Sequence, residues 1–229
     1  MSRSYALGGT LWLTLLTTAI GLGMRKAGSV RPPVLDKEGR FWVYKDGSTL
    51  EPPVPPYGLP FVPYAWMPKE SAEMLELNLK CTENPHKGKM CISVTIHWQS
   101  PWWVGVGFVS GPDKTMEGGP WWGKTPHGWY FDLSKLKKKR LVVHMRGERG
   151  GERVQWKVGF LGAEPYGDSL RFPAQSKWIT LTPEWKRYTV NLSRADLSRV
   201  CSLCFVLAQA QQHDPAAPVR FYIDEVYFE

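Results

Sequence analysis

Apolar and polar side chains alternate with a period of two residues through most of the chain after residue 68. Residues 73–81 and residues 91–98 are the clearest cases, and in the first of them Leu75, Leu77 and Leu79 share one face. Such alternation is typical of a β-strand with one buried face. The segment between the two runs, TENPHKGKM, is rich in turn-forming residues, so the pattern predicts a β-hairpin here.

The same pattern predicts further strands toward the carboxyl terminus. The Gly-rich segment GERGG lies between two of them and predicts a second hairpin, while one short helix is expected at residues 193–198 with Ser193 as its N-cap. Evenly spaced strands with Gly-rich turns predict an all-β domain over residues 69–229, an antiparallel jelly roll or β-sandwich that folds by itself. The further strands are expected at residues 104–109, 140–146, 152–160, 178–181, 186–192, 204–210 and 221–228.

The amino-terminal segment follows a different pattern. Residues 5–24 form a run of 20 residues without a charge, which as an α-helix would span about 30 Å, the thickness of a bilayer core. A cleaved signal peptide is the alternative. The small residues Ala19 and Gly21 lie inside the run rather than after it, and Arg25 follows directly. The sequence therefore favours an uncleaved transmembrane helix within residues 1–24.

Small side chains in this anchor would let it pack closely on another transmembrane helix. The alternative is that glycine is simply common in such helices. Basic residues after the segment favour a cytoplasmic body, whereas an aromatic-rich β domain is typical of exported proteins. We expect the body on the extracytoplasmic, periplasmic side of the membrane. The candidate packing residues are Gly8, Gly9, Ala19 and Gly23.

Residues 25–68 are rich in proline. Nine of the 19 prolines of the chain lie between Pro32 and Pro68, and proline favours extended, semi-rigid chain. This composition predicts a tether between anchor and body. Its many aromatic residues indicate that the tether packs along a surface, and residues 41–48 are compatible with a short strand and turn.

Composition narrows the classes without naming a function. Hydrophobic residues make up 43% and charged residues 22% of the chain, which excludes wholesale disorder. The net charge of +8 permits contact with nucleic acid, an anionic membrane or an acidic partner. Aromatic and basic residues fit a single-strand nucleic-acid binder in outline, but the hydrophobic leader argues against that location. We predict no nucleic-acid partner.

A set of segments in the order found here resembles the carbohydrate-binding-module-type jelly rolls of the galactose-binding-domain-like superfamily. The most specific are a strand with RGE-x-GGE, then EW-x-x-YT-x-x-L, then a final FY-x-D. The resemblance covers roughly residues 64–229 and implies a non-catalytic β-sandwich. A more distant similarity is to the complex I intermediate-associated protein family, which shares the DLS-then-strand pattern and acts in the assembly of a membrane complex. The segments are residues 84–92, 102–108, 120–123, 131–134, 145–159, 181–198 and 221–229.

Tryptophans are concentrated between residues 98 and 129. Indole rings stack on the apolar faces of sugars, and they also anchor protein interfaces. Trp102, Trp121 and Trp122 lie beside proline and glycine, so we expect them in loops as binding residues. Trp129 is a further binding candidate, with core packing as its alternative.

Polar candidates are fewer. Arg146 and Glu152 belong to a segment of alternating charge that local ion pairing would explain, and the alternative is that both are ligand contacts on a concave sheet face. Cys81 and Cys91 flank the first hairpin and would share a face only through a β-bulge. The CxxC motif that begins at Cys201 lacks the second half of a zinc pattern, so buried thiols or disulfides are expected.

The resemblance also bears on metals. A structural calcium is common in the superfamily, and Asp224 matches its terminal aspartate, so the resemblance implies a calcium site there. The five histidines show no HExxH motif and no close pairing along the sequence, so no other metal centre and no cofactor are expected.

No Ser/His/Asp arrangement or carboxylate pair is supported by neighbouring motifs, and we predict that the protein is not an enzyme. Two functions remain. The first is a membrane-anchored accessory subunit that docks on, and stabilises, a membrane protein complex of respiratory or photosynthetic type, with the lipid bilayer as a further partner. The alternative is an exported glycan-binding module that recognises polysaccharide through surface tryptophans.

Overall fold

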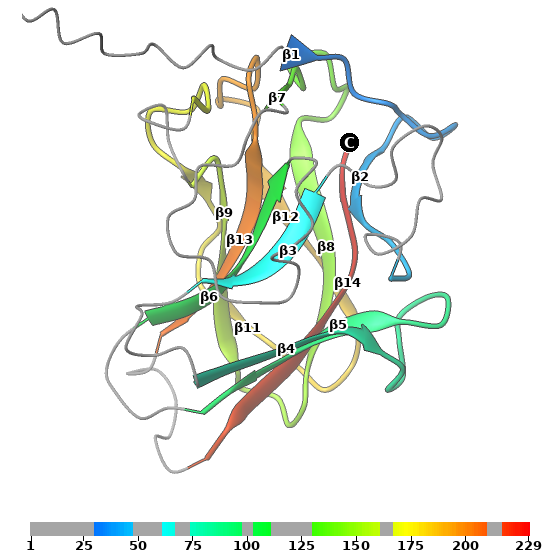
Figure 1. The fold of residues 1–229 in the computed structure, drawn as a ribbon, viewed down its shortest axis with the longest axis vertical. Coiled ribbons are helices and arrows are strands. Elements are labelled where there is room, and N and C mark those ends of the chain that lie inside the picture. The colour runs from blue at the N-terminus through cyan, green and yellow to red at the C-terminus, as the bar shows by residue number, and fades with distance from the viewer. Residues whose placement is uncertain are drawn as a thin grey trace, which may run out of the picture.

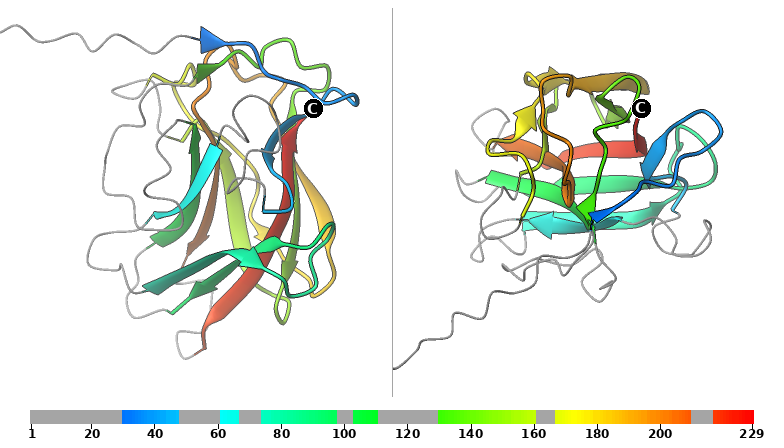
Figure 2. Two further views of the ribbon diagram at one scale, coloured as in Figure 1. Left: turned by 45° about the vertical axis from the view of Figure 1, so that its right-hand side comes forward. Right: turned by 90° about the horizontal axis from the view of Figure 1, so that it is seen from above.

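The computed structural model describes residues 30–47, 61–66, 74–97, 103–110, 130–160, 167–209 and 217–229. Within these ranges two antiparallel sheets pack face to face (Figure 1), and Figure 2 shows them turned by 45° and from above. The described residues therefore form the antiparallel β-sandwich that the period-two alternation predicts. The predicted helix at residues 1–24 lies outside the described residues.

The first sheet has six strands. Its order is β10-β9-β13-β6-β3, and β11 also pairs with β9. The long strand β13 is central, because it pairs with β6 on one side and β9 on the other. The strands are β3 (Phe61–Trp66), β6 (Trp103–Ser110), β9 (Arg153–Val158), β10 (Ala174–Gln175), β11 (Ile179–Thr180) and β13 (Ser202–Gln209).

The second sheet also has six strands. Its order is β12-β8-β14-β5-β4, and β2 pairs with the carboxyl-terminal part of β14. A short parallel pair, β1 (Val30–Arg31) with β7 (Tyr130–Phe131), lies apart from both sheets. The strands of the second sheet are β2 (Phe41–Tyr44), β4 (Leu75–Cys81), β5 (Cys91–Ile96), β8 (Arg140–Gly147), β12 (Lys186–Asn191) and β14 (Val219–Phe228).

The tether predicted at residues 25–68 is in part a component of the sandwich. Strand β2 pairs with β14, and strand β3 forms an edge of the first sheet against β6. The side chains of Phe41, Val43 and Phe61 are at most 2% exposed in the core. The predicted boundary at residue 69 thus falls inside the domain, because aromatic residues among the prolines supply core side chains rather than surface contacts.

Strands β8 and β9 do not form the hairpin predicted around GERGG. Strand β8 belongs to the second sheet and β9 to the first, so residues 148–152 cross from one layer to the other. Gly150 and Gly151 have φ angles of 83° and 93°, which allow the chain to turn away from β8. A local Gly-rich signal was correct about the turn, but it could not indicate which strand would become the partner.

Position 147 has no room for a side chain. A Cβ there would overlap the carboxylate of Glu152, which is 6% exposed and accepts a hydrogen bond from the backbone N–H of Arg149 at 2.9 Å. We expect Gly147→Ala to lower the free energy of unfolding by about 1–3 kcal/mol, because the overlap must displace a buried carboxylate. Urea unfolding measures this change. In a Glu152→Ala background the same substitution should cost clearly less, and an equal cost in both backgrounds would contradict the overlap.

The helix predicted at residues 193–198 is also absent from the structure. The side chain of Asn191 accepts the backbone N–H of Ser193 at 2.9 Å, and Asp196 accepts that of Ser198 at 3.0 Å. Such side-chain bonds to the backbone two residues on compete with helical hydrogen bonds and favour turns. Residues 193–198 are accordingly a series of turns after β12.

Candidate functional site

Several predicted site residues lie outside the described residues. They are the binding candidates Trp102, Trp121, Trp122 and Trp129 and the anchor residues Gly8, Gly9, Ala19 and Gly23. Their roles stay predictions. Within the described ranges, no helix combines the length and the apolar character needed to cross a membrane.

The structure does not bring Arg146 and Glu152 together as contacts on one face. The guanidinium of Arg146 lies 3.6 Å from the ring centre of Tyr222 and 5.6 Å from that of Trp185, and it donates a hydrogen bond to the backbone carbonyl of Glu83 at 3.1 Å. Glu152 is a buried residue of the connection between the sheets. The partners of Arg146 therefore come from distant segments of the chain.

Residues 82–90, the loop between β4 and β5, cover part of the outer face of the second sheet. Trp185 donates a hydrogen bond from its indole to the carbonyl of Asn84 at 2.8 Å, and Tyr222 donates to the carboxylate of Glu83 at 2.8 Å. Cys81 and Cys91 pair across the strands beyond a register shift, and both pack against Tyr222 as buried free thiols. The β-bulge that would bring the two cysteines to one face of the sheet is thus present. It places Cys81 on the face opposite that of Leu79.

Asp224 joins this loop to the centre of the sheet. It is 0% exposed, and its two carboxylate oxygens accept backbone N–H groups, from Lys87 at 3.1 Å and from Glu225 at 2.7 Å. Burial raises the pKa of Asp224 to about 6, although these hydrogen bonds act in the opposite direction. Calcium takes six to eight oxygen ligands, whereas the described partners of Asp224 are hydrogen-bond donors. These surroundings do not fit the calcium site that the resemblance implies.

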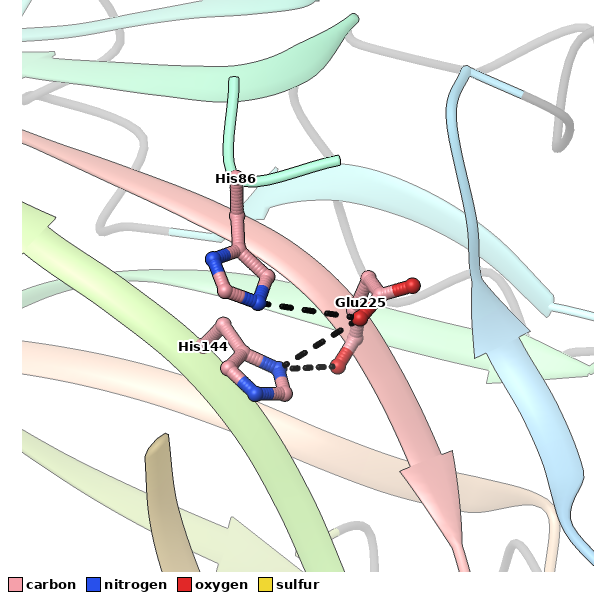
Figure 3. Close-up of side chains that lie close together, drawn as sticks. All are labelled: His86, His144 and Glu225. Carbon is pink, nitrogen blue, oxygen red and sulfur yellow. Dashed lines mark hydrogen bonds and ion pairs between the residues drawn. The ribbon is translucent and has the colours of Figure 1, made fainter. Parts of the chain in front are cut away.

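Two histidines and a glutamate converge beside Asp224 (Figure 3). His86 comes from the 82–90 loop, His144 from β8 and Glu225 from β14, and one ligand atom from each lies within 4.8 Å of the others. The rings of His86 and His144 are stacked, with centres 4.2 Å apart and planes 13° from parallel. We call these three residues the His–Glu cluster.

Sequence reasoning missed the His–Glu cluster. Its members are 58 and 81 residues apart along the chain and belong to no spaced motif. They meet because β8 and β14 are neighbours, with His144 opposite Asp224, and because the 82–90 loop folds over that position. The histidines show no close pairing along the sequence, yet His86 and His144 stack in space.

A second feature is a hollow of about 670 Å³ between residues 169–174 and residues 191–196. Phe172 lines it and is 76% exposed, the most exposed of the large hydrophobic side chains in the described part of the chain. Arg171 lies with its guanidinium 5.5 Å from the centre of the Phe172 ring, and Asn191, Arg194 and Asp196 line the opposite wall. We call this feature the Phe172 hollow.

Sequence analysis did not single out Phe172 either. The residue stands between Arg171 and Pro173, outside every alternating run. A segment that is polar and contains proline has no buried face, so a large aromatic side chain within it is expected to be exposed. The sequence could therefore have indicated Phe172 as a binding candidate.

Comparisons with known proteins give structural likeness only. No protein-family model and no curated protein matches the sequence. A family 30 carbohydrate-binding module is 14% identical and has a TM-score of 0.49, with 82% of this chain and 86% of that chain covered. The family 30 module of a cellulosomal cellulase of Clostridium thermocellum is 13% identical, with a TM-score of 0.48 and coverage of 83% and 96%.

A family 29 carbohydrate-binding module is 12% identical, with a TM-score of 0.41 and coverage of 83% and 91%. These three structures are all described as carbohydrate-binding modules. The comparisons do not show the complex I intermediate-associated family. At these identities and TM-scores the likeness assigns no ligand to this chain, so its function has to be argued from its own side chains.

Proposed function

We propose that this chain is a non-catalytic carbohydrate-binding protein and that the Phe172 hollow holds the sugar. The observation that carries the proposal is the exposure of Phe172, which is 76%, inside a hollow rather than on a convex surface. An aromatic ring left in water at such a place usually marks a contact. A sugar ring offers an apolar C–H face that can cover it.

The walls of the hollow suit the hydroxyl groups of a sugar. The side-chain oxygen of Asn191 accepts the backbone N–H of Ser193, and its amide carries two N–H donors in addition. Asp196 is an acceptor whose pKa is lowered by hydrogen bonds from Ser198, so it stays charged near neutral pH. The amide of Asn191 and the carboxylate of Asp196 can therefore form hydrogen bonds with the hydroxyl groups of a sugar, while the ring of Phe172 packs on its C–H face.

The charge of the hollow suggests the class of sugar. The charged side chains that line the hollow are two guanidinium groups, those of Arg171 and Arg194, and one carboxylate, that of Asp196. Guanidinium groups bind carboxylates and sulfates through paired, charge-assisted hydrogen bonds. We therefore expect a preference for acidic polysaccharides over neutral ones.

The test is glycan binding by the full chain and by Phe172→Ala. The variant should lose affinity at least tenfold, about 1.4 kcal/mol, because the stacking surface is gone. The melting temperature should not change, since an exposed ring contributes little to the core. Binding is measured on a panel of acidic and neutral polysaccharides by calorimetry.

Trp178→Ala is the matched control, because Trp178 is a half-buried aromatic residue outside the hollow. Its affinity for glycans should equal that of the wild type. Glycan binding that survives Phe172→Ala but fails in Trp121→Ala with Trp122→Ala would move the site to the predicted tryptophans. A protein that binds no polysaccharide would contradict the proposal itself.

The accessory-subunit function predicted from the sequence rests on the anchor at residues 1–24, on the aromatic-rich segment 25–68 and on the distant similarity to the complex I intermediate-associated protein family. Residues 1–24 lie outside the described residues. No feature of the described residues favours it over glycan binding. Detergent extraction of the native protein followed by size-exclusion chromatography would reveal a larger membrane assembly.

A further inference from the structure

We propose that the His–Glu cluster binds one divalent transition-metal ion of the zinc type. The ligand atoms are Nε2 of His86, Nδ1 of His144 and a carboxylate oxygen of Glu225, which Figure 3 shows converging from three segments of the chain. The cluster shares no residue with the Phe172 hollow. The site is therefore independent of the proposed glycan function.

The distances between the imidazole nitrogens and the Glu225 carboxylate fit a shared ion better than direct hydrogen bonds. Nδ1 of His144 also lies 3.4 Å from the backbone carbonyl oxygen of Glu225, and it gives up this hydrogen bond, with the ring proton on Nε2, when it binds an ion. Nε2 of His86 lies 3.8 Å, and Nδ1 of His144 lies 4.0 Å, from the same Glu225 oxygen, Oε2. Both distances exceed the range of a hydrogen bond, about 2.7–3.2 Å. Bonds of about 2.0–2.1 Å in a tetrahedral site separate the ligand atoms by roughly 3.3–3.4 Å. Each imidazole nitrogen needs to approach the Glu225 oxygen by about half an ångström. The two imidazole nitrogens lie within 4.8 Å of each other, so they need to approach by up to roughly 1.5 Å to share one ion.

A bulge in β14 aims Glu225 at the histidines. Asp224 pairs with His144 and Tyr227 with Val142, so Glu225 and Val226 together face one residue of β8. Glu225 has a φ angle of 42°, a left-handed conformation that is uncommon for a residue with a long side chain. In a regular strand the residue after Asp224 would point into the core. The bulge instead keeps Glu225 on the outer face and sends Val226 inward, where it is 0% exposed.

Asp224 and the loop position the third ligand. The backbone N–H of Lys87 donates to Asp224, which holds the 82–90 loop over β8 and places His86 above His144. Because the rings are nearly parallel, an ion can lie in both ring planes only after one ring tilts. The side chain of His86 is 27% exposed and that of His144 is 10% exposed, so His86 is the ring with room to move.

Binding of an ion has to displace a lysine from Glu225. The ammonium of Lys87 lies 3.3 Å from Glu225 and competes for its carboxylate. The Lys87 side chain is 64% exposed and can turn into solvent when an ion takes its place.

The donor set selects the class of ion. Two imidazoles and one carboxylate suit zinc, copper or nickel, whereas calcium and magnesium require oxygen ligands. Glu225 and Lys87 both line a second hollow, of about 370 Å³, that also includes Asp36 and Asp46. This hollow is the route by which the ion would reach Glu225.

The experiment titrates Zn²⁺ alone into the full chain after treatment with a chelator. We expect one Zn²⁺ per chain, measured by competition with a chromophoric chelator, and a rise of the melting temperature in its presence. His86→Ala and Glu225→Gln should each weaken binding by at least ~100-fold and abolish the thermal shift, since loss of an outer-shell partner alone costs roughly 10–100-fold. Ca²⁺ should produce no shift.

His97→Ala is the matched control. His97 lies 3.0 Å from Glu76 on the surface, so it is a histidine–carboxylate pair without a second imidazole among the described residues. This variant should bind Zn²⁺ like the wild type. Two results would overturn the proposal: no Zn²⁺ bound at about 1 mM, or equal binding by the wild type and His86→Ala. Equal binding would mean that other histidines hold the ion. The melting curve of His86→Ala shows whether the variant is folded, which this comparison requires.

Discussion

A fragment of residues 69–229 is expected not to fold cooperatively, although the alternation of its sequence suggests a self-contained domain. Deleting residues 1–68 removes β2 and β3 and with them Phe41, Val43, Tyr44 and Phe61, each at most 2% exposed in the core. Burial of such side chains contributes about 1.5–3 kcal/mol each, or about 6–12 kcal/mol together. The whole stability of a domain is about 5–15 kcal/mol.

The deletion would also leave β6 as an unpaired edge, because β3 pairs with it along residues 61–66. Exposed edges promote aggregation. The control is a fragment of residues 30–229, which retains both strands and should melt cooperatively by circular dichroism. A fragment of residues 69–229 that unfolds with the same midpoint as this control would show that β2 and β3 are dispensable.

Trp156→Ala should produce the largest loss of stability of any single substitution considered. Trp156 is 0% exposed, stacks on Phe108 with ring centres 6.3 Å apart, and donates its indole N–H to the sulfur of Met145 at 3.0 Å. It therefore joins β9 of the first sheet to β8 of the second. Replacing a buried tryptophan by alanine typically costs about 3–5 kcal/mol, because a cavity remains.

Urea unfolding measures this loss as a shift of the midpoint at an unchanged slope. Trp156→Phe should cost less, since the aromatic packing on Phe108 remains while the N–H donor is lost. Trp178→Ala at a half-buried position should stay within about 1 kcal/mol of the wild type. A loss below about 1 kcal/mol for Trp156→Ala would mean that the two sheets are not held together at this position.

The two functional proposals have separate readouts. Phe172→Ala should weaken glycan binding and leave the response to Zn²⁺ intact, whereas His86→Ala should do the reverse. The two sites use different segments of the chain, the first lined by residues 169–174 and 191–196 and the second formed by the 82–90 loop, β8 and β14. A variant that loses both responses together with its thermal transition has lost its fold, and the melting curve identifies that case.

Local alternation was sufficient to find nine of the 14 described strands. The nine predicted runs coincide with described strands within a few residues, from β4 at Leu75–Cys81 to β14 at Val219–Phe228. The reason is physical, since successive side chains of a strand point to opposite faces and a sandwich buries one of them. The fold class followed from this periodicity and from the spacing of the turns.

Partner choice was decided only by the tertiary structure. Strands β8 and β9 are adjacent in sequence yet lie in different sheets, and the proline-rich segment before residue 69 supplies one strand to each six-stranded sheet. The sequence of a turn does not show whether the next strand pairs with the preceding one or crosses to the other sheet. The contacts that settle the matter join residues far apart in the sequence.

The candidate sites show the same division. The sequence by itself determined which side chains are available. They include the imidazoles of His86 and His144 and the aromatic ring of Phe172 beside a proline. Only the packing of β14 between β8 and β5, and the bulge at Glu225, decided that His86, His144 and Glu225 meet. A one-residue bulge reverses which face a side chain occupies, and because it depends on pairing with another strand, no periodicity of the β14 segment alone could reveal it.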